Sequence, residues 1–174
     1  MEIDVVEPAV RDAFAASVDE EPEQFHAAIE AILDRGDDFT IAAFQLAINV
    51  AAVILQDLHE GELPGEEEIG DLAEDFAETQ EEWSEVSAEL ARTYMSAALG
   101  EEAVLDVMSP GDVAVTGFAL GGWLLSAFLP EADEAAEADQ ADEAADSGEP
   151  GATKDWDDYL DDILKVLSSA LAED

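Results

Sequence analysis

Glu23, His26 and Glu30 come closer to a metal site than any other residues of this chain, by type and spacing. In a helix, residues three and four apart share one face, so two carboxylates and one imidazole would line up. Helical bundles that bind two metal ions use two such Glu-x-x-His pairs and two further Glu residues. The other histidine, His59, has Gln56 three residues before it, so the second pair is missing. We expect no metal ligands and no cofactor.

Acidic residues are too frequent for any one carboxylate to indicate catalysis. The chain holds 46 Asp and Glu against 5 Lys and Arg, so an acid near a histidine is expected by chance. It has no Cys, no Gly-x-Ser-x-Gly elbow and no glycine-rich phosphate loop. We expect no catalytic residues and a protein that is not an enzyme. A helical-bundle enzyme or metal carrier is an alternative that we favour less than the two interaction functions considered below.

The net charge of -41 indicates the salt concentration in which the protein works, and it says little about function. A compact domain with this charge repels itself at ordinary salt, whereas molar salt shortens the screening length to about 3 Å. Such a composition is typical of an acidic, halophilic protein. It also speaks against nucleic acid as a partner, because no cations cluster to contact phosphates. The first residues have neither a basic region nor an apolar run, so we expect a cytoplasmic protein.

Apolar residues recur at helical spacing along the chain, and no segment alternates with the period of a strand. We therefore predict an all-α fold. Residues 1–130 form a multi-helix bundle with two uncharged central helices. Residues 131–154 form an acidic, Ala-rich, disordered and flexible linker, and residues 155–174 form a C-terminal amphipathic helix.

Proline and glycine mark the ends of the predicted helices. Pro8 and Pro22 suit first helical positions, and Gly36 ends the second helix. Ser109 and Pro110 form a further explicit helix start. The predicted helices begin at Pro8 and Pro22 and then cover residues 39–59, 66–99, 101–108 and 113–129.

Residues 66–99 are predicted to form one long helix with a heptad seam. Five apolar residues lie seven apart in it: Ile69, Phe76, Trp83, Leu90 and Ala97. Such a seam packs either inside an antiparallel bundle or against another chain as a coiled coil. We favour the bundle.

Two uncharged segments, 39–55 and 113–129, leave two environments open. Their length is at the lower limit for crossing a bilayer, and no Lys or Arg near their ends would set an orientation. Gly117 and Gly121 would permit close contact with a neighbouring helix in lipid or in a soluble core. Three amide side chains lie near one face of the first segment: Gln45, Asn49 and Gln56. We favour a soluble core, with a membrane-embedded or membrane-associated accessory protein as the alternative.

The C-terminal helix is the predicted partner-binding element. Its apolar face consists of Trp156, Tyr159, Leu160, Ile163, Leu164, Leu167 and Leu171. A helix of this length is marginal alone in water, so this face must pack on the chain's own bundle or on a partner. The two possibilities stay open. We therefore expect a non-catalytic helical protein-interaction protein (an adaptor, chaperone-like or assembly protein) that binds a protein partner or a second copy.

Overall fold

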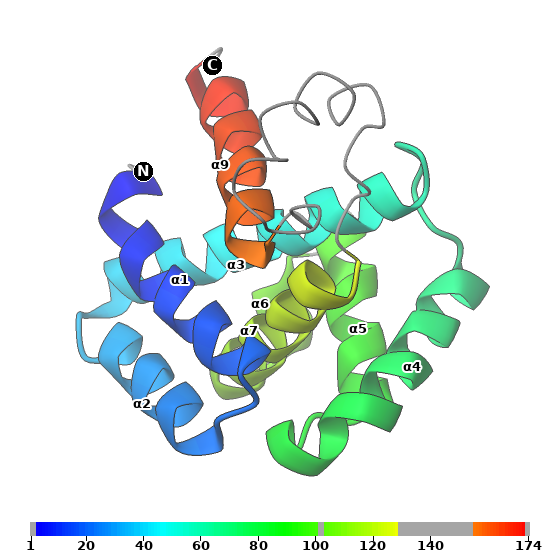
Figure 1. The fold of residues 1–174 in the computed structure, drawn as a ribbon, viewed down its shortest axis with the longest axis horizontal. Coiled ribbons are helices and arrows are strands. Elements are labelled where there is room, and N and C mark those ends of the chain that lie inside the picture. The colour runs from blue at the N-terminus through cyan, green and yellow to red at the C-terminus, as the bar shows by residue number, and fades with distance from the viewer. Residues whose placement is uncertain (1–2, 101–102, 129–154, 173–174) are drawn as a thin grey trace, which may run out of the picture. The chain divides into compact units, whose positions relative to one another are not determined.

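The computed structural model of this chain describes residues 3–100, 103–128 and 155–172, and over these residues it is all-α (Figure 1). They form eight helices and no strand, so the predicted all-α class is confirmed. The predicted linker, 131–154, lies outside the described residues. The chain divides into two compact units, Met1–Leu124 and Leu125–Asp174.

The first unit contains α1 to α6 and most of α7, and the second contains α9. Consecutive helices α1 and α2 pack together, as do α4 and α5 (Figure 1). The helix bounds are α1 (Ile3–Val18), α2 (Pro22–Leu33), α3 (Asp37–Leu58), α4 (Glu66–Ser84), α5 (Ala88–Leu99), α6 (Val104–Val107), α7 (Pro110–Ala127) and α9 (Trp156–Ala172).

The uncharged helix α7 lies at the centre of the first unit. Every residue from Val113 to Leu124 is buried except the half-buried Val115. The predicted start of this helix is confirmed, because the backbone N–H of Asp112 donates to the Ser109 hydroxyl at 3.2 Å. A helix that is apolar all round is stable in water only when other helices cover all its faces.

Aromatic side chains from three other helices pack against α7. The Phe118 ring lies 5.7 Å from the Phe14 ring of α1 and 6.3 Å from the Phe44 ring of α3, measured between centroids. The Trp123 ring lies 5.5 Å from the Phe76 ring of α4. All three pairs meet edge to face, the geometry that the ring quadrupoles favour.

Glycines allow α1 to lie directly on the backbone of α7. A Cβ atom on Gly121 would stand 3.0 Å from Cζ of Phe14, and one on Gly122 would stand 2.6 Å from Cβ of Ser17. The Ser17 hydroxyl donates to the backbone carbonyl of Ala119 at 3.1 Å across this contact. The predicted close contact of this segment with a neighbouring helix is therefore confirmed for its described part.

The other uncharged helix, α3, is buried on one face only. Its buried face packs in the core through Phe44, Leu46, Val50, Ile54 and Leu55 among others. The opposite face has exposed or half-buried side chains: Ile41, Gln45, Ile48, Asn49, Val53 and Gln56. This exposed face of α3 is uncharged, because no acid or base lies between Asp38 and Asp57.

The predicted start of the first helix is wrong, and the predicted helix over 101–108 is reduced to α6 (Val104–Val107) among the described residues. The helix α1 begins at Ile3 and contains Pro8, although proline removes a backbone donor inside a helix. Ile3 and Val6 are buried in line with Val10 and Phe14, and this continuous apolar stripe offsets the lost hydrogen bond.

The predicted long helix over 66–99 is interrupted. Glu85 adopts a left-handed conformation (φ 61°) after α4, and the Ser87 hydroxyl then caps α5 by accepting from the N–H of Leu90 at 3.3 Å. Beyond the break, α5 packs against α4 (Figure 1). The predicted seam does not continue into α5, because its buried residues are Ala91, Tyr94 and Met95, whereas Leu90 and Ala97 are half-buried.

Every described helix has an acidic residue in its first turn and no basic residue in its last turn. Acids near the N-terminus interact favourably with the helix dipole. Three acids also occupy left-handed positions at helix ends: Glu20, Glu60 and Glu85. Those positions favour glycine or asparagine, so the acidic composition extends to sites where another residue would be more stable.

Candidate functional site

An open groove of about 260 Å³ lies along the exposed face of α3, between α3, α5 and the region of α6. Its walls are Gln45, Ile48, Asn49, Ala97, Ala98, Gly100, Ala103, Val104 and Leu105. None of these nine residues has an ionisable side chain. Among the described residues, the groove therefore lacks the acidic side chains that are frequent in a chain of net charge -41.

Two amide side chains form the polar part of this groove. The side-chain N–H of Gln45 donates to Oδ1 of Asn49 at 3.0 Å, one helical turn along α3. This pairing uses one donor group and one acceptor, and it leaves Oε1 of Gln45 and the Asn49 amide N–H groups for a ligand or partner. The sequence placed these residues on one face of the helix but gave no sign that this face is exposed.

Two buried hydroxyl groups lie in the core of the first unit. Tyr94 of α5 and Thr116 of α7 are each fully buried, and neither hydroxyl has a hydrogen-bond partner among the described residues. The Tyr94 hydroxyl lies over Gly117, 2.8 Å from where a Cβ atom would stand. Burial raises the pKa of Tyr94 well above its ordinary value, because the phenolate would lose its hydration. Such a phenol stays protonated at neutral pH.

The three residues with partial metal-site spacing lie on the surface of α2. Glu23, His26 and Glu30 are all exposed on α2, and Nδ1 of His26 donates to the carbonyl oxygen of Pro22 at 2.7 Å. Among the described residues, no three or more potential ligands lie close enough together to hold a metal ion.

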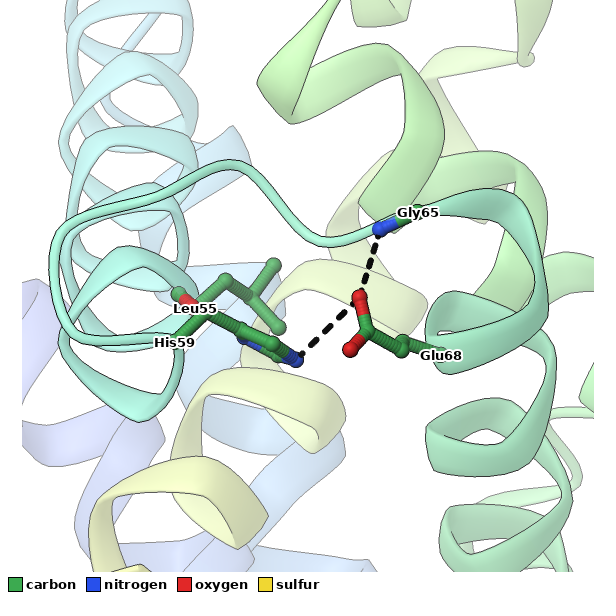
Figure 2. A network of polar contacts seen from close by, with 4 residues as sticks. All are labelled: Leu55, His59, Gly65 and Glu68. Atoms are coloured by element: carbon green, nitrogen blue, oxygen red, sulfur yellow. Dashed lines mark hydrogen bonds and ion pairs between the residues drawn. The ribbon is translucent and has the colours of Figure 1, made fainter.

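The second histidine joins the end of α3 to the start of α4 (Figure 2). Nδ1 of His59 donates to the carbonyl oxygen of Leu55 at 2.8 Å, and its Nε2 lies 3.9 Å from Oε2 of Glu68. The same carboxylate oxygen accepts from the backbone N–H of Gly65 at 2.7 Å and so caps α4. These contacts are local to one connection, so we assign them to holding the two helix ends together.

A further polar network connects the α1–α2 turn to α4. The side-chain amide of Gln80 donates to Oε1 of Glu20 at 3.0 Å, and its own oxygen accepts from the indole N–H of Trp83 at 2.8 Å. The Trp83 ring packs edge to face on Phe25 of α2, with 5.1 Å between centroids. Both ends of the Gln80 amide are satisfied, so this network positions helices.

The predicted partner-binding residues lie on α9. Four of them share one buried face: Tyr159, Leu160, Ile163 and Leu164. Trp156 and Leu167 are half-buried, and the side chain of Leu171 lies outside the described residues. Val166 is a large apolar residue that the prediction left out, and it is 58% exposed. The opposite side of α9 contains Asp161 and Lys165, both exposed.

By length and composition, α3 is the one helix among the described residues that is apolar enough to cross a membrane. Its mean hydropathy reaches 1.8, and 44% of the residues in that window are buried in the structure. A core helix of a soluble protein meets the same criterion. In comparisons with known proteins, no family model, no curated protein and no solved structure matches this chain.

Proposed function

We propose that this chain is a non-catalytic, cytoplasmic helical protein of a halophile that acts through protein contacts, as an adaptor, chaperone-like or assembly protein. One observation carries the proposal: α9 concentrates its large apolar side chains on one face and belongs to a unit separate from the helical bundle. An amphipathic helix of this kind is a common recognition element, because its apolar face fits a groove on a partner.

The charge on α9 supports a protein partner over a lipid surface. Four aspartates lie along this helix: Asp157, Asp158, Asp161 and Asp162. Helices that lie on anionic membranes usually have Lys and Arg on the polar face, and here Lys165 is the only base. The side-chain ammonium of Lys165 is already paired with Asp162, at 3.2 Å.

The test is removal of residues 155–174, together with a double variant, Leu160→Asp with Leu164→Asp, which places charge on the apolar face. If α9 binds a partner or a second copy, both changes leave the bundle's Tm nearly unchanged and abolish co-purification from the native host, or dimerisation. If α9 packs on its own bundle, both changes lower the Tm and expose a dye-binding apolar surface.

A matched control adds the same two charges elsewhere on α9, as Ser168→Asp with Ser169→Asp, at exposed positions. This control should behave like the parent in stability and in partner recovery. If neither the deletion nor the Leu variant changes stability, oligomeric state or partner recovery, α9 is a passive tail and the proposal fails.

The second candidate is a membrane-embedded or membrane-associated accessory protein. The hydropathy of α3 favours it, and the exposed Ile41 would contact lipid in that case. Detergent-free solubility of the full chain at high salt distinguishes the two candidates, because a membrane protein would pellet with lipid or aggregate.

A further inference from the structure

The exposed face of α3 is an uncharged strip on a highly acidic protein. From Phe39 to Gln56 no residue is charged, over a length of about 27 Å at 1.5 Å per residue. The exposed acids of α3 lie at its two ends, at Asp37, Asp38 and Asp57, whereas α2 and α6 expose acids along their length, such as Glu30 and Asp106. The strip continues into the groove through Leu105, which is 39% exposed.

The hydrogen-bonding groups on this strip are complementary to themselves. Gln45 and Asn49 use one donor and one acceptor on each other. Each copy of the chain is left with one unbonded amide oxygen and one unbonded amide NH2 group, whichever of the two side chains donates. A two-fold axis perpendicular to α3, midway between these residues, would bring each free donor opposite the free acceptor of the other copy.

We propose that the exposed face of α3 is a self-association surface, on which a second copy of this chain packs its own α3 in antiparallel orientation. The two amide pairs lie at the centre and Ile41, Ile48 and Leu105 lie around them. This proposal goes beyond the proposed function, because it concerns a surface of the first unit and does not involve α9.

Charge selects a second copy as the occupant. Molar salt screens the repulsion between two molecules of net charge -41 only beyond about 3 Å, so carboxylates in direct contact still repel and close packing favours an uncharged face. A basic partner would be attracted most strongly to the acidic faces and least strongly to this uncharged one. Lipid tails would leave the Gln45 and Asn49 amides without partners, at a cost that a polar partner avoids.

The first experiment is sedimentation of the full chain in molar KCl, compared with Gln45→Glu and with Gln24→Glu. Both substitutions make the same chemical change at an exposed helix position, but Gln24 lies on α2, outside the groove. We expect the parent and Gln24→Glu to be dimers. Gln45→Glu should raise the dimer dissociation constant by about tenfold or more, because it places two like charges close together at the centre of the interface. Its circular dichroism should equal that of the parent.

A second experiment locates the contact independently. The chain has no cysteine, so Gln45→Cys introduces a single thiol. A short bismaleimide should cross-link this variant into dimers, and it should not cross-link Gln24→Cys. Deletion of residues 155–174 should leave the dimer intact, which separates failure of this proposal from failure of the proposed function.

Three results would overturn the proposal. The first is a parent protein that is monomeric at tens of micromolar. The second is a Gln45→Glu variant that dimerises as strongly as the parent. The third is flotation of the parent, but not of Gln45→Glu, with uncharged phosphatidylcholine vesicles. That result would show that this face binds lipid.

Discussion

Phe14 of α1 lies against the backbone of α7 at Gly121, so closely that a Cβ atom there would stand 3.0 Å from Cζ of the ring. Gly121→Ala should therefore lower the free energy of unfolding by about 1–3 kcal/mol, the usual cost of overpacking. Gly70 of α4 is the matched control, because a Cβ atom there meets nothing within 4 Å. Gly70→Ala should raise the free energy of unfolding by about 0.5–1 kcal/mol. Thermal melts at high salt measure both, and equal effects of the two would contradict the contact.

The buried hydroxyl of Tyr94 should destabilise the protein. It has no hydrogen-bond partner among the described residues, and an unsatisfied buried group costs about 1–3 kcal/mol. Tyr94→Phe removes this group and keeps the ring that packs on Gly117, so we expect a rise of about 1 kcal/mol in the free energy of unfolding. A loss of stability would mean that the hydroxyl has a partner, such as a buried water.

The same residue should make stability depend on alkaline pH. Burial raises the pKa of Tyr94, so the folded protein keeps the phenol proton at a pH where the unfolded chain has lost it. The unfolded state then binds fewer protons, and stability falls as the pH rises above about 10. Denaturant unfolding of the parent and of Tyr94→Phe should be measured on both sides of this pH. The free energy of unfolding should fall less with rising pH in the variant than in the parent. Parallel declines would assign the effect to other groups.

Gln80→Glu should weaken the connection between the α1–α2 turn and α4. The change is nearly isosteric and keeps an acceptor for the Trp83 indole, but it places a second carboxylate where the amide donates to Glu20 at 3.0 Å. We expect a loss of about 1.5–3 kcal/mol in the free energy of unfolding, the usual value of a hydrogen bond to a charged group. Gln24→Glu, at an exposed position, is the control for the added charge.

Glu60 occupies a position at the end of α3 that glycine would fill better. Its φ is 56°, and the N–H of the next residue, Gly61, donates to the carbonyl oxygen of Gln56 at 2.8 Å, as in a Schellman motif. Glu60→Gly should raise the free energy of unfolding by about 1 kcal/mol, since a left-handed conformation is costly for residues with a Cβ atom. Glu60→Gln is the control: it removes the negative charge near the C-terminal end of the helix dipole but keeps a side chain with a Cβ atom. If both variants gain equally, the backbone conformation contributes nothing.

Folding should depend on salt if the protein is halophilic. The 46 acidic residues are opposed by 5 basic ones, and the screening length grows from about 3 Å at 1 M salt to about 10 Å at 0.1 M. Helical circular dichroism and Tm should therefore fall as KCl is reduced from molar to dilute concentrations. An unchanged spectrum and Tm in dilute buffer would contradict the halophile hypothesis.

The sequence predicts the helical class and the central place of α7 well, because both follow from local signals. An uncharged run with glycines, opened by Ser109 and Pro110, has few alternatives to a buried helix. Boundaries that depend on packing are predicted less well. The break at Glu85 is decided by the return of α5 onto α4, and Pro8 is tolerated because Ile3 and Val6 are buried.

The groove beside α3 could not have been predicted from spacing along the chain. Its walls come from three segments, around Gln45, Ala97 and Leu105, which only the tertiary fold brings together. The helical period placed Gln45 and Asn49 on one face correctly. Whether an uncharged face is exposed depends on how many other helices are available to cover it. Here α1, α3 and α4 all pack against α7.

The central position of α7 also limits when this protein can fold during synthesis. Ser17 of α1 bonds to Ala119, a residue 102 positions later, and Phe14 and Phe44 pack on the Phe118 ring beside it. A nascent chain that has emerged from the ribosome only as far as α6 has helices whose aromatic side chains lack the surface they finally cover. The core therefore closes only when α7 emerges.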